Sequence, residues 1–241
     1  MKYGSLLIQK DQLDRRLMTV KRISLKDSRF QCVEGARKIA STDDKSQQWV
    51  IIGCSPVYRT FYVEQETSPV CWSSDSKIPD VDVPEPISKS CMNCENNIKG
   101  SGQGGSRACR FHRRIAVVMA NHMNGEVYQV ILSGISVFGK GGDGAWPLDK
   151  YVEFLNGNKV SLSHVVSEAQ FDMDSAIPKL IFTPVRALTE DEYSVIADQM
   201  QKENTKEITK LKIFKKDNYG FTPVSPELSS INQPKTEVVY E

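Results

Sequence analysis

Four cysteines have a spacing that suits a bound metal. Cys91 and Cys94 form a Cys-x2-Cys pair, with Cys71 placed 20 residues before it and Cys109 placed 15 residues after it. Four thiolates make a closed tetrahedral site for Zn2+, and such a site is structural because no position is left open for water. The sequence therefore predicts a structural zinc centre on these cysteines, with His112 as an alternative ligand.

The chain between these cysteines also favours a metal. Residues 72–90 are rich in proline and residues 95–108 are rich in glycine, and neither stretch has a periodic apolar face. Such segments bury little core of their own, so a metal would organise them. Cys32 and Cys54 have no Cys-x2-Cys partner, and we expect both to be ordinary, partly buried side chains.

Positive charge gathers beside the cysteines. The 241-residue chain has 31 basic and 30 acidic residues, a formal net charge of +1, yet the stretch Lys99–Arg114 has five cations and no acid. A local basic patch attracts phosphate, whereas the alternative is an ordinary solvated surface. The cations predicted to contact a nucleic-acid backbone are Lys99, Arg107, Arg110 and Arg113.

Aromatic side chains supply the second ingredient of single-strand binding. Proteins that hold single strands combine a basic groove with aromatic rings on which bases stack. The alternative for each ring is a place in the core, and the sequence leaves open which face of a strand is buried. The further candidates for nucleic-acid contact are Tyr58, Arg59, Phe61, Tyr62, Trp72, Tyr128, Phe138, Lys140 and Trp146.

Signals of catalysis are weak. Gly134, Gly139 and Lys140 have the spacing of a phosphate-binding P-loop, but Gly141 stands where that motif needs Ser or Thr. Asp172 and Asp174 have a spacing that suits Mg2+, but they sit beside a predicted turn. We therefore predict a protein that is not an enzyme, with a metal-dependent nuclease or nucleotidyl enzyme as an alternative.

Short strands dominate the predicted elements. An Asn-Gly turn joins two of the strands into a hairpin, and a capping box of Thr189 and Glu192 opens the last helix. Residues 27–48 are predicted to be irregular or a short helix. The predicted strands are 15–25, 49–54, 57–63, 114–120, 126–137, 165–171 and 179–185, and the predicted helices are 147–158 and 190–211.

These elements predict a mainly β, α+β fold. We expect an OB-like barrel with an inserted zinc module of four cysteines and a C-terminal helix. The predicted parts are an N-terminal segment at 1–48, an OB-like core at 49–216 with the zinc-ribbon insertion at 71–110, and a disordered tail at 217–241. No apolar run approaches the ~20 residues of a membrane span, and no signal peptide is evident, so a cytoplasmic protein without a membrane partner is expected.

The cysteine block also carries a family resemblance. Residues 71–118, which include SCMNCENNIKGSGQGGSRACRFHRRIAVV, resemble a cysteine-rich block of single-stranded DNA-binding proteins from tailed bacteriophages. The stretch KLIFTPVRALTEDEYSVI is similar to the C-terminal part of the same proteins, and the resemblance covers residues 49–200. In more distant form it resembles the protein of T4-like phages, where one His and three Cys bind zinc within an OB fold. This chain has four Cys instead.

The resemblance implies a role in phage replication, recombination or transcription in an infected bacterial cell. Single-stranded DNA is the implied partner, and a phage or host polymerase or replication protein is a second partner reached through the C-terminal tail. Phage proteins of this class often end in a strongly acidic tail, whereas the tail here is mildly acidic. The alternative hypothesis is a zinc-ribbon protein-interaction module that recruits a polymerase or another replication or transcription enzyme.

Overall fold

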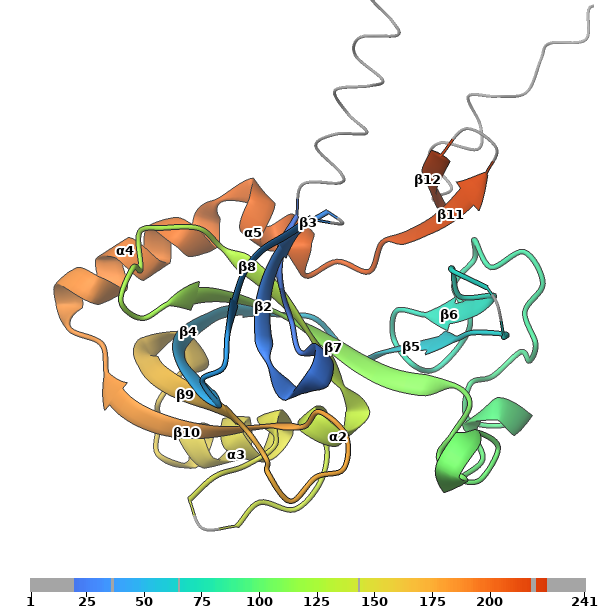
Figure 1. The fold of residues 1–241 in the computed structure, drawn as a ribbon, viewed down its shortest axis with the longest axis horizontal. Coiled ribbons are helices and arrows are strands. Elements are labelled where there is room, and N and C mark those ends of the chain that lie inside the picture. The colour runs from blue at the N-terminus through green and yellow to red at the C-terminus, as the bar shows by residue number, and fades with distance from the viewer. Residues whose placement is uncertain (1–19, 36, 65, 143, 218–219, 225–241) are drawn as a thin grey trace, which may run out of the picture. The chain divides into compact units, whose positions relative to one another are not determined.

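A computed structural model describes residues 20–35, 37–64, 66–142, 144–217 and 220–224 (Figure 1). The chain divides into two compact units. The first unit is drawn from Met1–Pro56 and His112–Lys210, and the second from Val57–Phe111 and Leu211–Glu241. The second unit therefore contains the whole cysteine-rich stretch predicted as an insertion.

A curled sheet of eight strands forms the first unit, as a half-barrel (Figure 1). The strand order is β10-β9-β4-β7-β8-β1-β2-β3. Neighbouring strands are antiparallel except for β1 and β8, which pair in parallel. The strands are β1 Lys21–Ser24, β2 Phe30–Glu34, β3 Arg37–Thr42, β4 Ser46–Cys54, β7 Arg110–Met119, β8 Tyr128–Ser133, β9 Val165–Phe171 and β10 Leu180–Ala187.

Helices pack against the strands and close the first unit. Tyr151 of α3 shares a 2.7 Å hydrogen bond between its hydroxyl and that of Ser167 in β9. Gln199 of α4 donates from its amide nitrogen to the carbonyl oxygens of Met123 and Gly125, which lie between β7 and β8. The helices are α2 Gly134–Val137, α3 Leu148–Gly157, α4 Glu190–Gln201 and α5 Glu203–Ile208, with short 3-10 turns at Lys26–Ser28 and Leu162–His164.

Strand β4 shows why this sheet needs cover on both faces. Residues 49–52 are all buried, although neighbouring side chains of a strand point to opposite faces. Val50 packs in a cluster with Ile196 of α4. The ring of Trp49 meets that of Phe30 edge-on, with centroids 5.5 Å apart. A continuous apolar run is therefore the pattern that a strand covered on both faces requires.

The second unit has little regular structure and a small core. Residues 58–61 and 71–73 form two antiparallel strands, and much of the chain from 74 to 109 is irregular. Its apolar cluster consists of Trp72, Val83 and Ile213. So small a core contributes little folding stability, and a bound metal would add stability to this unit. The elements are β5 Tyr58–Phe61, β6 Cys71–Ser73, β11 Ile213–Asp217 and β12 Gly220–Val224, with 3-10 turns at Glu95–Asn97 and Gln103–Gly105.

Most predicted elements are present, and the α+β class is confirmed. The structure confirms the strands predicted at 49–54, 57–63, 165–171 and 179–185 and the hairpin of β7 and β8. The helix predicted at 147–158 is α3, and the capping box of Thr189 and Glu192 is formed. No helix in the described residues is both long and apolar enough to span a membrane.

Four predicted segments differ from the structure. Strands β2 and β3 pair as a hairpin, with Gly35 after β2 at a φ of 58°, where the sequence predicts irregular or helical structure. The strand predicted to reach 137 ends at Ser133, and α2 comes next. The helix predicted to reach 211 breaks at Lys202, whose ψ is 134°. Residues 220–224 of the predicted disordered tail pair with β11, and 225–241 lie outside the described residues.

Candidate metal centre and nucleic-acid interface

The four predicted zinc ligands line one small cavity in the second unit. Its volume is about 20 Å³, close to the space of a single water-sized sphere, and therefore of one ion. The structure thus brings together cysteines that lie up to 38 residues apart (109 − 71) in the chain. The lining residues are Cys71, Cys91, Cys94 and Cys109 with Phe61, Pro79, Ile87, Ser88, Ser90 and Asn96.

Backbone hydrogen bonds hold these cysteines in place. Cys71 lies in β6, directly opposite Phe61 of β5. The Cys91 N–H donates to the carbonyl oxygen of Lys77 at 2.8 Å, and the Cys109 N–H donates to that of Asn96 at 2.8 Å. The carbonyl oxygen of Cys94 accepts from the Asn97 N–H at 2.9 Å, which turns the chain after the Cys-x2-Cys pair. The positions therefore depend on the local fold of the loops.

Burial and the neighbouring cysteines raise the pKa of two of these thiols. Burial raises the pKa of the Cys109 thiol to about 11, the Arg59 guanidinium lowers it, and the neighbouring Cys91, Cys71 and Cys94 raise it. Burial is also the first cause of a raised pKa at Cys71, where Cys91 and Cys94 again add repulsion. A cation among the sulfurs would relieve this repulsion and displace their protons.

The donor set fits Zn2+. Within the described residues, no group of three or more His, Cys, Asp or Glu has an arrangement that already suits a metal ion. Four thiols nevertheless surround a cavity of one ion's size, and rotation about χ1 moves each sulfur while the backbone stays in place. His112 is not among the described residues that line this cavity. Cys71, Cys91, Cys94 and Cys109 would hold the ion as a cross-link of the loops.

Arg59 is buried next to this cavity. Its side chain is 3 % exposed, its Nη1 donates to the Cys91 carbonyl oxygen at 3.5 Å, and its guanidinium carbon lies 3.9 Å from the centroid of the Phe111 ring. Within the described part of the chain, Nε has no hydrogen-bond partner. The sequence predicts that Arg59 contacts nucleic acid. In this structure it is enclosed, so it does not present its charge to a phosphate.

Two further predicted contacts are core residues. Tyr58 is 4 % exposed and Trp72 is 2 % exposed. The Trp72 ring packs in the small core of the second unit, and its Nε1 donates to Oδ1 of Asp82 at 3.3 Å. Neither ring has a face on which a base can stack.

Three predicted cations are exposed in the same unit as the cysteines. Lys99, Arg107 and Arg110 are open to solvent. Arg107 donates from Nε to the carbonyl oxygen of Asn97 at 2.7 Å, which holds the side chain beside the turn after Cys94. Tyr62 is 50 % exposed and Phe61 is half-buried at the cysteine cavity. The three cations and Tyr62 therefore remain candidates for contact with a nucleic acid.

Arg113 has a structural role instead. It lies on β7 in the first unit and is half-buried. Its Nη1 lies 2.6 Å from Oδ1 of Asp149, and its Nε donates to the Ser55 carbonyl oxygen at 2.9 Å. Its charge is already paired, so the prediction that it binds a nucleic-acid backbone is not favoured by this geometry.

Aromatic rings of the first unit form a parallel stack. The Trp146 ring lies 4.4 Å from that of Phe154 and 6.5 Å from that of Tyr151, with interplanar angles of 19° and 20°. The backbone of Gly141 lies so close to the Trp146 ring that a side chain at 141 would collide with it. Trp146 is half-buried, and Phe154, which is 37 % exposed, is the more exposed ring of the pair.

Sequence reasoning missed Phe154. The available signal was its place three residues after Tyr151 on a predicted helix, a spacing that puts two side chains next to each other. Of the other predicted contacts in this unit, Phe138 is 41 % exposed, Lys140 is exposed, and Tyr128 is half-buried on β8.

The weak catalytic motifs do not form catalytic sites in the described residues. Helix α2 begins at Gly134, the first residue of the P-loop-like spacing, whereas a P-loop needs its helix after the lysine. The Asp172 carboxylate forms a 2.6 Å ion pair with Lys179, and hydrogen bonding to that lysine lowers its pKa. This geometry favours a turn over a Mg2+ site.

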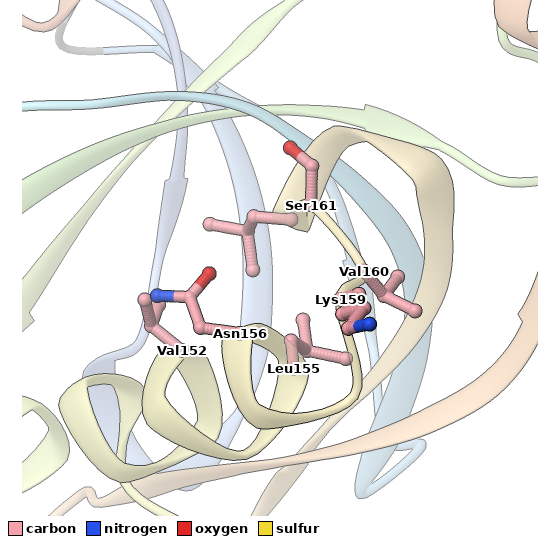
Figure 2. Close-up of a pocket in the computed structure, with 7 residues that line it drawn as sticks. Val152, Leu155, Asn156, Lys159, Val160 and Ser161 are labelled. Atoms are coloured by element: carbon pink, nitrogen blue, oxygen red, sulfur yellow. The ribbon is translucent and has the colours of Figure 1, made fainter.

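A larger open cavity lies at the end of α3. Its volume is about 370 Å³, and Figure 2 shows side chains of α3 and of the segment after it around the opening. None of the predicted site residues lines it, and its lining residues include no acid and no histidine. Lys159 is the one charged residue among them, and the full lining is Val152, Leu155, Asn156, Lys159, Val160, Ser161 and Leu162.

Comparison with known proteins gives no relative of this chain. No protein-family model, curated protein or solved structure matches it. The function of the chain must therefore be inferred from the cysteine cavity, the buried Arg59 beside it and the exposed cations of the same unit.

Proposed function

We propose that this chain is a non-enzymatic single-stranded DNA-binding protein with a structural Zn2+ centre on Cys71, Cys91, Cys94 and Cys109. The observation that carries the proposal is the set of exposed cations, Lys99, Arg107 and Arg110, in the same small unit as these cysteines. No acidic residue lies between 99 and 114. Cations that are clustered without acids favour a polyanionic partner.

The metal would act through the backbone that carries these cations. Cys94 precedes the turn whose Asn97 carbonyl oxygen accepts from Arg107. Cys109 immediately precedes Arg110. A cross-link between the four sulfurs would therefore fix the positions of the charges that meet the phosphates, and loss of zinc would loosen both the fold and the binding site.

Aromatic rings would complete the binding of bases. Tyr62 exposes part of a ring in the same unit as these cations. Phe138 and Phe154, with the exposed Lys140, are separate candidates within the first unit. Stacking on such rings tolerates any base, so little sequence preference is expected. The curled half-barrel is compatible with an OB-like barrel, a fold that binds single strands on its sheet.

Titration of a labelled oligo-dT at several salt concentrations tests this proposal. For a single strand, the logarithm of the binding constant falls with the logarithm of salt concentration by about 0.7 for each phosphate neutralised, so three cations predict a slope of about −2. Duplex DNA of equal length is the control and should bind more weakly. Equal binding of the duplex, or no binding at low salt, would overturn the proposal, and cleavage of the strand with Mg2+ present would indicate a nuclease.

A protein-interaction module is the second candidate, because the second unit also exposes apolar side chains. Val81 is 92 % exposed, Met92 69 %, Ile98 64 % and Ile78 57 %. Exposed apolar side chains mark a protein-binding surface where they gather into one patch. Such a module would recruit a polymerase or another replication or transcription enzyme. The double variant Val81→Ser and Met92→Ser should leave oligo-dT affinity unchanged if DNA binding depends on the cations.

A further inference from the structure

Arg59 is a buried cation, and no acidic side chain among the described residues forms an ion pair with it. Its side chain is 97 % enclosed (100 − 3), and none of the ion pairs between described residues includes it. Nη1 has one weak hydrogen bond to the Cys91 carbonyl oxygen, and Nε has no partner within the described residues. A guanidinium removed from water in this way requires a nearby negative charge.

The strand geometry points Arg59 toward the cysteine cavity. Side chains two residues apart on a strand share a face, so Arg59 and Phe61 lie on the same face of β5. Phe61 lines the cavity and pairs with Cys71 across β5 and β6. The contact of Arg59 with the Cys91 carbonyl oxygen places the guanidinium at the same group of ligands.

The charge of the cysteine centre matches this cation. Four thiolates carry a charge of −4, and Zn2+ reduces it to −2, which leaves a buried dianion. Such a dianion is unfavourable away from water unless a cation lies near it, and an unpaired guanidinium has the converse requirement. Each group therefore supplies the charge that the other lacks.

We propose that Arg59 is the buried counter-ion of the four-cysteine zinc centre, a positioning residue that favours the metal-bound set of four thiolates. This inference rests on the proposed zinc centre and does not depend on DNA binding. Arg59 touches neither DNA nor metal. Its charge raises the affinity of the site for a divalent ion. The contact of its guanidinium with the Phe111 ring keeps that charge in place.

Three substitutions separate charge from the other properties of this side chain. Arg59→Lys keeps the charge, Arg59→Gln keeps a donor for the Cys91 carbonyl oxygen, and Arg59→Met keeps the packing against Phe111. The measurement is the zinc affinity of the full chain by competition with a metal chelator. We expect the Lys variant to stay within a few-fold of the parent, and the Gln and Met variants to lose about 10- to 100-fold. Arg37→Gln, which alters an exposed cation on β3 of the first unit, is the matched control and should be unchanged.

Other outcomes would overturn the inference in distinct ways. A Gln variant with parental affinity would assign the effect to the hydrogen bond, and a Met variant with parental affinity would assign it to packing. Equal losses in all three variants would indicate that only the shape of arginine matters. A parent chain without zinc would remove the centre itself, whereas zinc in the parent with no effect in the series would remove only the role of Arg59.

Binding of cobalt in place of zinc provides a second measurement, which separates an effect of charge from a purely structural effect. The intensity of the sulfur-to-cobalt charge-transfer band reports the number of thiolates on the metal. At saturating Co2+, the Gln variant should show the parental band at a higher midpoint concentration, and its circular dichroism should match the parent. A band of lower intensity would mean that Arg59 holds a cysteine in place, which would overturn a role through charge. Oligo-dT affinity at saturating zinc should be unchanged in the Gln variant.

Discussion

Arg113 of β7 and Asp149 of α3 form an ion pair in which Nη1 and Oδ1 lie 2.6 Å apart. Asp149 stands in the first turn of α3, where the helix dipole also favours a carboxylate. Nε of Arg113 donates to the Ser55 carbonyl oxygen just after β4. One guanidinium therefore joins a helix to two strands, although it lies only three residues after the exposed Arg110.

Arg113→Ala should lower the stability of the folded protein and leave its DNA affinity unchanged. The variant loses a partly exposed ion pair and one charged hydrogen bond, so we expect the free energy of unfolding to fall by about 1–2 kcal/mol. Asp149→Asn should have a smaller effect in the same direction. Urea unfolding measures this change. A lower salt slope for oligo-dT binding in Arg113→Ala, with stability unchanged, would contradict the structural role.

Cys91→Ala should release zinc and loosen the second unit. The variant leaves three thiolates around the cavity, so the metal site is incomplete, and loss of metal removes folding stability from loops that have little core. Metal analysis and limited proteolysis of residues 71–110 measure both effects. Cys32→Ala is the matched control, since Cys32 is a half-buried thiol on β2 of the first unit. Full zinc content and unchanged oligo-dT affinity in Cys91→Ala would contradict the proposed centre.

The cysteine group could be predicted from sequence because spacing alone indicates it. The pair Cys91 and Cys94 needs only a short turn, and Cys71 and Cys109 flank it at a spacing that suits four ligands, and all four line one cavity. Strands such as β4 and β9 were also predictable, because a buried strand leaves a clear apolar pattern. The β2–β3 hairpin was not, since β3 is exposed along nearly its whole length and has no apolar alternation.

The roles of single cations and rings could not be predicted in this way. Arg59, Arg110 and Arg113 are chemically equal in a sequence, yet one is enclosed, one is exposed and one is paired with an acid. The difference depends on long-range contacts, such as the one between Arg113 and Asp149, which are 36 residues apart. Trp72 is buried through long-range contacts as well, since it packs with Val83 and Ile213.

Removal of the exposed cations should change the salt dependence of DNA binding. The triple variant Lys99→Ala, Arg107→Ala and Arg110→Ala loses the clustered charges of the second unit. We expect the salt slope of oligo-dT binding to fall in magnitude by about 2, at about 0.7 for each cation, with zinc content unchanged. Arg37→Ala, an exposed cation on β3, is the control and should keep the parental slope. An unchanged slope in the triple variant would remove these residues from the interface.

Phe154 should contribute to the binding of bases by stacking. Its ring is the more exposed member of the stack with Trp146, so Phe154→Leu keeps an apolar side chain and removes the aromatic face. We expect oligo-dT affinity to fall by about 1–2 kcal/mol, with the salt slope unchanged because no charge is altered. Phe154→Trp should retain the affinity. A loss in Phe154→Trp equal to that in Phe154→Leu would indicate a packing effect instead of stacking.

Glu192 should make the stability of the first unit depend on pH in a narrow acidic window. Hydrogen bonds from Arg186, with Nη1 and Nη2 each 2.7 Å from a carboxylate oxygen, lower the pKa of this carboxyl from its ordinary 4.5 to about 2, and the Thr189 N–H of the capping box adds to this effect. A group with a lowered pKa in the folded state contributes stability above its unfolded pKa and loses it as pH falls through the folded pKa. The parent should therefore be more stable than Glu192→Gln at pH 6, and this difference should shrink between pH 4.5 and pH 2. Urea unfolding followed by circular dichroism measures it, with Glu190→Gln in the same helical turn as the control. A difference that is constant down to pH 2 would show that the interaction does not depend on the charge of Glu192.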